Sequence, residues 1–282
     1  MSVRNNEDRT AAKGGGDTDS PEIMGPSAGP FSFVAPTEFV DLPSKGEYYS
    51  EGHPLHNQDS VEIRYMTAKD EDILTSRSLL KKGLVIDRLI QNLLVDKSIR
   101  TEDLLIGDKN AIIVAARATG YGSEYKTKVT CPSCAEFVEH TFDLSEATIN
   151  TTDATSEMKK TDNATFVVRL PKLNVDVEVK LLTGKDEKHL TKLSATKKKH
   201  KLEESLLTDQ FKQFIVSVNG DRDGTAIAML VDNMPAFDSR FLRHEYHSVV
   251  PNIDLAQEFE CAGCGFEQEM EVPFTADFFW SR

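Results

Sequence analysis

Two widely separated pairs of cysteines constrain this fold more than any other feature of the sequence. The pairs are Cys131-Pro-Ser-Cys134 and Cys261-Ala-Gly-Cys264, and the chain contains no other cysteine. Runs of alternating polar and apolar residues flank each pair, which predicts a β-hairpin whose turn presents two thiolates, as in a zinc knuckle. A tetrahedral zinc site needs four ligands. The sequence therefore predicts one structural Zn²⁺ held by both pairs together.

The 126 residues between the two pairs far exceed the short spacer of an ordinary zinc ribbon. If both pairs bind one metal ion, this whole stretch is an insertion that is closed at its base. We therefore predict a split zinc ribbon made of residues 121–145 and 252–274. The inserted subdomain comprises residues 146–251.

Two other uses of paired cysteines stand as alternatives. A redox CxxC of the thioredoxin kind opens a helix after a strand, whereas residues 136–142 alternate as a strand does. A disulfide framework is typical of secreted chains, and the absence of a recognisable signal peptide predicts synthesis in a reducing cytoplasm. A catalytic zinc ion is disfavoured because four thiolates leave no coordination position for water.

The remainder of the chain predicts an α+β fold of helical subdomains and small antiparallel β elements. Residues 1–30 are rich in Gly, Ser, Thr and Asp and predict a disordered N-terminal arm. Residues 31–120 predict a β and loop segment followed by a helical subdomain, and residues 61–65 within them alternate strictly, as a strand does.

Three short helices are expected in this first helical subdomain. The first has Thr67 as a candidate N-cap and Gly83 as a stop. The second carries an apolar stripe over residues 86–94, and the third is predicted to begin with Asp108 as its N-cap and to end at Gly120. Consecutive acidic residues after the first cap are interpreted as capping and dipole chemistry, because they cannot converge on one metal ion.

The inserted subdomain is expected to begin with a loop over residues 146–163 and a hairpin over residues 165–181. A strongly charged helix is predicted from Gly184 to about residue 207, and a last helix covers residues 237–247. Residues 211–218 between them are apolar on one face.

Charge and motifs exclude several classes of function. The chain has 33 Lys and Arg residues against 46 Asp and Glu residues, and a formal net charge of −13 disfavours broad binding to nucleic acid or to anionic lipid. The basic run at residues 197–201 is interpreted as a solvated helix face. No apolar run reaches the length of a bilayer span. Because the sequence has no HExxH, G-x-S-x-G, Walker or G-x-G-x-x-G motif, a non-enzymatic binding or assembly role is expected.

The C-terminal tail, residues 275–282, is unusually aromatic for a polar chain. Phe278, Phe279 and Trp280 follow one another, and the tryptophan is the only one in the sequence. Either these side chains pack on the protein's own core beside the second cysteine pair, or they anchor in a partner protein. They are the candidate partner-binding residues.

Several longer motifs resemble a known family. They are Phe39-Val-Asp-Leu-Pro-Ser-Lys-Gly-Glu-Tyr-Tyr49, Gly52-His-Pro-Leu55, Tyr65-Met-Thr-Ala-Lys-Asp-Glu-Asp-Ile-Leu74 and Phe278-Phe-Trp280. From about residue 31 to its end, the chain resembles the baseplate hub protein family of T-even-like contractile-tailed bacteriophages. The resemblance implies a non-enzymatic hub component or hub assembly factor whose partners are other baseplate hub or tail proteins. It also implies a location in the host cytoplasm during assembly or in the virion baseplate.

A zinc-ribbon module associated with nucleic acid or transcription is the alternative function. Such a module would use the basic run at residues 197–201 together with aromatic residues of the knuckles. The net charge argues against it, and so does the scarcity of basic residues around the cysteine pairs, where only Lys126 and Lys128 occur.

Overall fold

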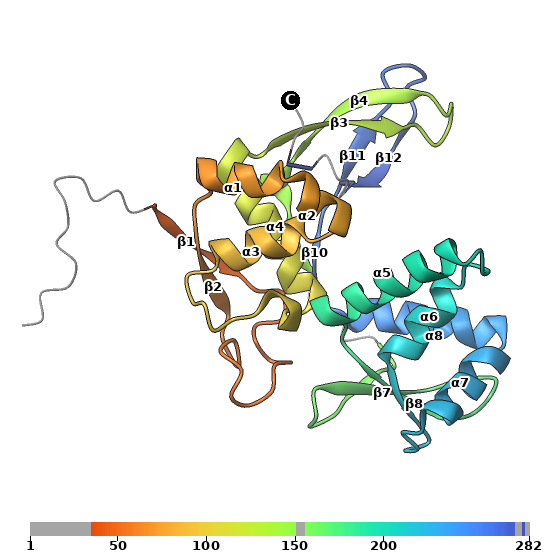
Figure 1. Ribbon diagram of the computed structural model, residues 1–282. Coiled ribbons are helices and arrows are strands. Elements are labelled where there is room, and N and C mark those ends of the chain that lie inside the picture. Colours follow the sequence, from red (N-terminus) through yellow and green to blue (C-terminus); the bar gives the residue numbers. More distant parts are fainter. Residues whose placement is uncertain (1–34, 151–155, 274–277, 280–282) are drawn as a thin grey trace, which may run out of the picture. The chain divides into compact units, whose positions relative to one another are not determined.

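The computed structural model describes residues 35–150, 156–273, 278 and 279. Groups of helices and groups of short strands follow one another along them (Figure 1). The helices are α1 (Ala68–Leu74), α2 (Arg77–Lys82), α3 (Val85–Leu93), η1 (Thr101–Asp103), α4 (Ile106–Tyr121), η2 (Leu144–Glu146), α5 (Gly184–Lys199), α6 (Leu206–Phe214), α7 (Gly224–Asn233) and α8 (Ala236–Val249). The strands are β1 (Thr37–Asp41), β2 (Ser60–Arg64), β3 (Glu124–Thr130), β4 (Phe137–Asp143), β5 (Thr148–Asn150), β6 (Lys159–Lys160), β7 (Thr165–Arg169), β8 (Asp176–Lys180), β9 (Ile215–Val218), β10 (Asn252–Asp254), β11 (Ala256–Glu260) and β12 (Glu267–Glu271). The predicted mixture of helices and small antiparallel β elements is confirmed.

The sheets are small and depend on their surroundings. Two-stranded antiparallel sheets pair β1 with β2, β3 with β4, β5 with β10 and β11 with β12, while β6, β7, β8 and β9 form one four-stranded sheet. Because an isolated two-stranded sheet is marginally stable in water, each pair must gain stability from packing against helices or against another pair. No helix of the described chain is both long enough and apolar enough to cross a membrane.

The first predicted helix is two helices, which corrects the sequence analysis. Between Thr67 and Gly83 the chain forms α1 and α2, separated by Thr75 and Ser76. The Thr75 hydroxyl donates to the carbonyl of Glu71 at 2.9 Å, and Ser76 has extended backbone with ψ of 104°. Ser76 thus leaves the helical conformation and becomes the N-cap of α2, so one helix ends and the next begins at this position.

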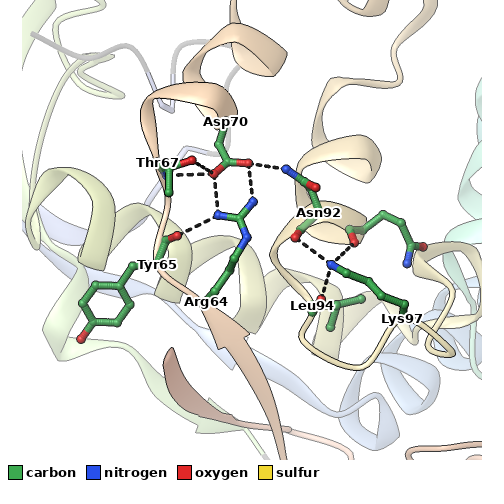
Figure 2. A network of polar contacts seen from close by, with 8 residues as sticks. Arg64, Tyr65, Thr67, Asp70, Asn92, Leu94 and Lys97 are labelled. Atoms are coloured by element: carbon green, nitrogen blue, oxygen red, sulfur yellow. Dashed lines mark hydrogen bonds and ion pairs between the residues drawn. The ribbon is translucent and has the colours of Figure 1, made fainter. Parts of the chain in front are cut away.

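The start of α1 and the end of α3 are joined by one polar network (Figure 2). The buried carboxylate of Asp70 accepts hydrogen bonds from the Arg64 guanidinium at 2.7 and 2.8 Å, from the Thr67 N–H at 2.8 Å and from the Asn92 amide at 2.6 Å. Burial by itself raises the pKa of Asp70, but these donors outweigh it and hold the pKa at about 2. The predicted capping role is confirmed for Asp70, which forms a capping box with Thr67.

Asp108 is not the N-cap of the third predicted helix, which is a second correction. Helix α4 begins at Ile106, and Asp108 lies buried in its first turn. Its carboxylate accepts hydrogen bonds from the Ser44 N–H at 3.0 Å, the Ser44 hydroxyl at 2.6 Å and the Tyr49 hydroxyl at 2.7 Å. Desolvation raises the pKa of Asp108. The residue therefore holds the turn-rich segment after β1 against α4 instead of capping the start of the helix.

The beginning of the insertion differs from its prediction. Residues 146–163, expected to form a loop, contain β5 and β6. Strand β5 pairs with β10, so the segments that enter and leave the insertion lie side by side. The hairpin predicted over residues 165–181 is confirmed as β7 and β8.

The helices of the insertion also have different limits from those expected. The charged helix from Gly184 ends at Lys199, and a separate helix, α6, begins at Leu206. The apolar stretch 211–218 is divided at Phe214 into the end of α6 and strand β9. Helix α7 was not predicted, whereas the last predicted helix is confirmed as α8.

The insertion contacts the first residue of α4 and the segment just before this helix through backbone hydrogen bonds. The Ile106 N–H donates to the Leu182 carbonyl at 3.1 Å, and the Gly184 N–H donates to the Leu104 carbonyl at 2.9 Å. On the same helix, a Cβ at Gly107 would lie 1.9 Å from the carbonyl oxygen of Pro251. Only glycine fits there, because the backbone before β10 lies directly on α4.

Candidate metal centre

The first cysteine pair lies in the turn between β3 and β4. The Cys131 N–H donates to the Glu136 carbonyl at 2.9 Å, and the Ala135 N–H donates back to the Cys131 carbonyl at 2.9 Å. Ala135 adopts the left-handed conformation with φ of 58°, which lets the chain reverse within the turn. Backbone hydrogen bonds therefore fix the conformation of this turn without a bound metal ion.

The second pair lies in the turn between β11 and β12 and repeats this geometry. The Cys261 N–H donates to the Phe266 carbonyl at 2.9 Å, and the Gly265 N–H donates to the Cys261 carbonyl at 2.8 Å. Gly265 has φ of 68° and occupies the position equivalent to that of the left-handed residue in the first turn. Each cysteine pair is thus held in the same backbone frame.

The four sulfur atoms of the two cysteine pairs lie close together. Sγ of Cys131 lies 3.8 Å from Sγ of Cys264, and Sγ of Cys134 lies 3.8 Å from Sγ of Cys261. All four lie within 4.8 Å of one another. A disulfide requires sulfurs about 2.05 Å apart, so the cysteines are free thiols. Four thiolates in this arrangement could bind a metal ion.

Backbone N–H groups adjust the acidity of the first pair. The N–H of Cys134 donates to Sγ of Cys131, and with the N–H of Ser133 it lowers the pKa of the Cys131 thiol to about 7. The N–H of Glu136 acts in the same direction on Cys134, but desolvation and hydrogen bonds with the neighbouring thiols together outweigh it and raise the pKa of Cys134 to about 12. One thiolate therefore forms readily near neutral pH, and it is the thiolate that binds metal.

Side chains as well as sulfurs bring the two hairpins together. The Gln257 amide accepts a hydrogen bond from the Asp143 N–H at 2.9 Å and donates to the Asp143 carbonyl at 2.6 Å. The ring of His140 lies edge-on to Phe142 at 4.6 Å and to Phe259 at 5.2 Å, both measured between ring centroids. These contacts position the cysteines independently of any ligand.

Sequence reasoning missed Gln257 and His140 as supports of the site. The available signal was alternation, because Gln257, Phe259 and Cys261 lie two residues apart and so face the same side of β11. A glutamine in an inward-facing row needs a polar partner. Its partner, the Asp143 backbone, is 114 residues away and therefore not visible in the sequence.

The aromatic candidates do not belong to the cysteine cluster. Phe278 and Phe279 are each 3% exposed. The ring of Phe278 contacts that of Tyr125 on β3 with 5.0 Å between centroids, and its carbonyl accepts a hydrogen bond from Nε of Arg117 at 3.0 Å. This burial is what the core alternative requires for these two residues, and Trp280 lies outside the described residues. Binding to a partner stays a prediction.

Comparison with known protein families identifies the family of this chain. A family model described as "T4 bacteriophage base plate protein" matches residues 35–280, a span that includes both cysteine pairs and the insertion. No curated protein and no solved structure matches the chain. The match confirms the resemblance seen in the sequence and marks the chain as a structural component of the phage tail. The chain belongs to the T4 bacteriophage base plate protein family.

Proposed function

We propose that the protein is a non-enzymatic component of the baseplate hub, or a factor in hub assembly, that acts through contacts with other tail proteins. The match to a baseplate family over residues 35–280 carries this proposal. The buried carboxylates support it as well. Asp70 and Asp108 each accept several hydrogen bonds from neighbouring groups, so both serve the fold.

We also propose that the four cysteines hold one structural Zn²⁺. A tetrahedron with zinc–sulfur bonds of about 2.3 Å has edges of about 3.8 Å, and two of the measured sulfur separations are 3.8 Å. Four protein ligands close the coordination sphere, which suits a structural ion. Metal analysis of the purified chain tests the identity of the ion, because iron also accepts four sulfurs in a tetrahedron.

The proposed metal divides the chain into functional segments. We propose a split zinc ribbon of residues 121–145 and 252–274 and an inserted subdomain of residues 146–251, alongside the N-terminal subdomain. The pairing of β5 with β10 supports this division, because the insertion leaves and rejoins the ribbon through neighbouring strands. Assembly is proposed to take place in the host cytoplasm.

The test of the functional proposal follows the protein through an infection. Tail proteins should co-purify with the tagged chain from infected cells, and cells infected with a phage that lacks the gene should accumulate fewer complete baseplates. Detection of the chain in purified particles identifies a hub component, whereas its absence from particles identifies an assembly factor. Normal baseplates without the protein would contradict both forms, and salt-sensitive retention on DNA would favour the nucleic-acid alternative.

A further inference from the structure

A cavity of about 490 Å³ lies among α2, α3, α4, α5 and the Phe278–Phe279 segment. We propose that it is a docking site for an acidic segment of a partner protein that carries one large apolar side chain. The inference rests on the proposed function, because it specifies which kind of partner surface this baseplate protein binds. In this proposal Phe278 and Phe279 form part of a binding site and do not insert into the partner.

The interior of the cavity is apolar. Its lining includes Ile86, Ile106, Ile113, Phe278 and Phe279. Ile86 belongs to the apolar stripe of α3, yet it is only half-buried, while its neighbours Leu89 and Ile90 are each 1% exposed. The part of the stripe formed by Leu89 and Ile90 is therefore buried in the protein, whereas Ile86 is partly exposed in the cavity. A buried aromatic or branched side chain from a partner would remove this open apolar surface from water.

The carboxylates in the cavity wall are already neutralised. Asp87 lies 2.9 Å from the ammonium of Lys109 and 3.0 Å from that of Lys188. Glu187 lies 2.6 Å from the Lys109 ammonium. These two acids and two bases form one network between α3, α4 and α5 and contribute no net charge to the cavity.

Two further lysines on the rim have no such partner. Lys82, in the last turn of α2, and Lys192, on α5, line the cavity and are exposed. Neither makes an ion pair with any residue that the structure describes. The cavity therefore carries two positive charges in excess, although the protein as a whole has a net charge of −13. Such a local reversal of sign favours a negatively charged partner and repels a basic one.

The two phenylalanines then act as a receiving wall. Because Phe278 and Phe279 are buried and their rings contact each other with 5.6 Å between centroids, they cannot insert into a partner without leaving their own core. They can, however, contact an apolar side chain that enters between the two rim lysines. Phe278 and Phe279 would therefore contact an apolar side chain of the partner and would not themselves insert into the partner.

Photo-crosslinking of the full chain during infection tests the proposal. A photoreactive phenylalanine replaces Thr191, which lines the cavity, or His189, which is exposed on the opposite face of the same helix and does not line it. The expected crosslink from position 191 joins a tail-protein segment that has more Asp and Glu than Lys and Arg and contains a large apolar residue. Position 189 should give no such product. A basic segment, a segment without a large apolar residue, a second copy of this chain, or no crosslink from position 191 would overturn the proposal.

Charge reversal gives the matched control. The double variant Lys82→Glu and Lys192→Glu should reduce the crosslink yield from position 191 about tenfold. The double variant Lys81→Glu and Lys198→Glu changes the same two helices and the same net charge away from the cavity, and it should leave the yield within about twofold. Thermal melts of both variants test whether they are folded. If co-purification of tail proteins survives while both doubles behave alike, the cavity proposal fails and the proposed function stands. If the wild-type chain forms no complex, the proposed function itself fails.

Discussion

The two hairpins that carry the cysteines have nearly the same backbone and very different outer faces. Lys128 on β3 and Glu258 on β11 stand at equivalent positions, three residues before the first cysteine of each pair. Lys128 lies opposite Glu139 on the neighbouring strand, whereas Glu258 lies opposite Glu269. Glu260 and Glu267 form a second like-charged pair. Like charges directly opposite each other destabilise a sheet.

The exposed face and the inner face of the second hairpin contribute differently to its stability. The second hairpin keeps its register although its exposed face is a row of glutamates, so cross-strand charge does not hold it. Its inner face does, through Gln257, Phe259 and the cysteine cluster. A two-stranded sheet of this kind needs outside support, and here each hairpin supports the other. Substitutions that exchange residues between the hairpins test this account.

The largest effect is expected from the cysteines themselves. Cys131→Ser and Cys261→Ser each remove one of four ligands, so each should release the metal and lower the free energy of unfolding by about 3 kcal/mol or more. The measurements are metal content per chain and thermal melting. Because one ion is shared, the two variants should be equally affected. Full metal content in one variant and none in the other would show that the hairpins do not share a site.

An exchange at the left-handed position of the turns comes next. Ala135 and Gly265 both follow the second cysteine of their pair and both have positive φ, but only glycine adopts it without steric cost. Ala135→Gly should raise the free energy of unfolding by up to about 1 kcal/mol, and Gly265→Ala should lower it by about 1 kcal/mol or more. Denaturant titration measures both. Changes of the same sign would mean that the turns are not equivalent.

A smaller effect is expected from exchanging the outer charges. Glu258→Lys gives the second hairpin the charge pair of the first and should stabilise the protein by about 0.5 kcal/mol. Lys128→Glu does the reverse and should destabilise it by a similar amount. Melts at low and high salt provide the control, because screening should shrink both changes. A stabilisation that persists unchanged in high salt would point to a cause other than charge.

The smallest effect concerns pH and His140. Burial lowers the pKa of His140 below its ordinary value, so the unfolded chain binds a proton more readily than the folded one. The neutral ring contributes its full stability above the unfolded pKa of about 6.5, and this contribution is lost as the pH falls below that value. His140→Met introduces the residue found at the equivalent position of the second hairpin, Met270. The stability difference between wild type and variant should shift against wild type on acidification, and a constant difference would contradict the assignment.

Local chemistry made part of this structure predictable. The CxxC spacing and the alternating flanks predict both hairpins, since all the necessary signals lie within about twelve residues of each turn. The Thr67 cap was equally visible, because its partner Asp70 is only three residues away. The family resemblance rested on similarly continuous motifs.

Features set by distant partners were not predictable. Aspartate is a common N-cap residue, so the local sequence predicted that role for Asp108. Its role as a buried acceptor of hydrogen bonds depends on Ser44 and Tyr49, which are 64 and 59 residues away. Strand β5 is three exposed residues long and exists because β10, about a hundred residues later, pairs with it. The break after α1 lies at Ser76, whose extended backbone has no distinct signal in the sequence.

The long sequence separation of the two cysteine pairs affects when the metal site can form during synthesis. A ribosome adds about 5–20 residues per second, so the 126 residues between Cys134 and Cys261 separate the emergence of the two pairs by about 6–25 s. During that interval the first pair can offer a metal only two ligands, and β3 and β4 lack the hairpin that supports them. The insertion, in contrast, can fold as it emerges. The metal we propose would therefore be taken up last, and its binding would mark a chain whose insertion has been completed.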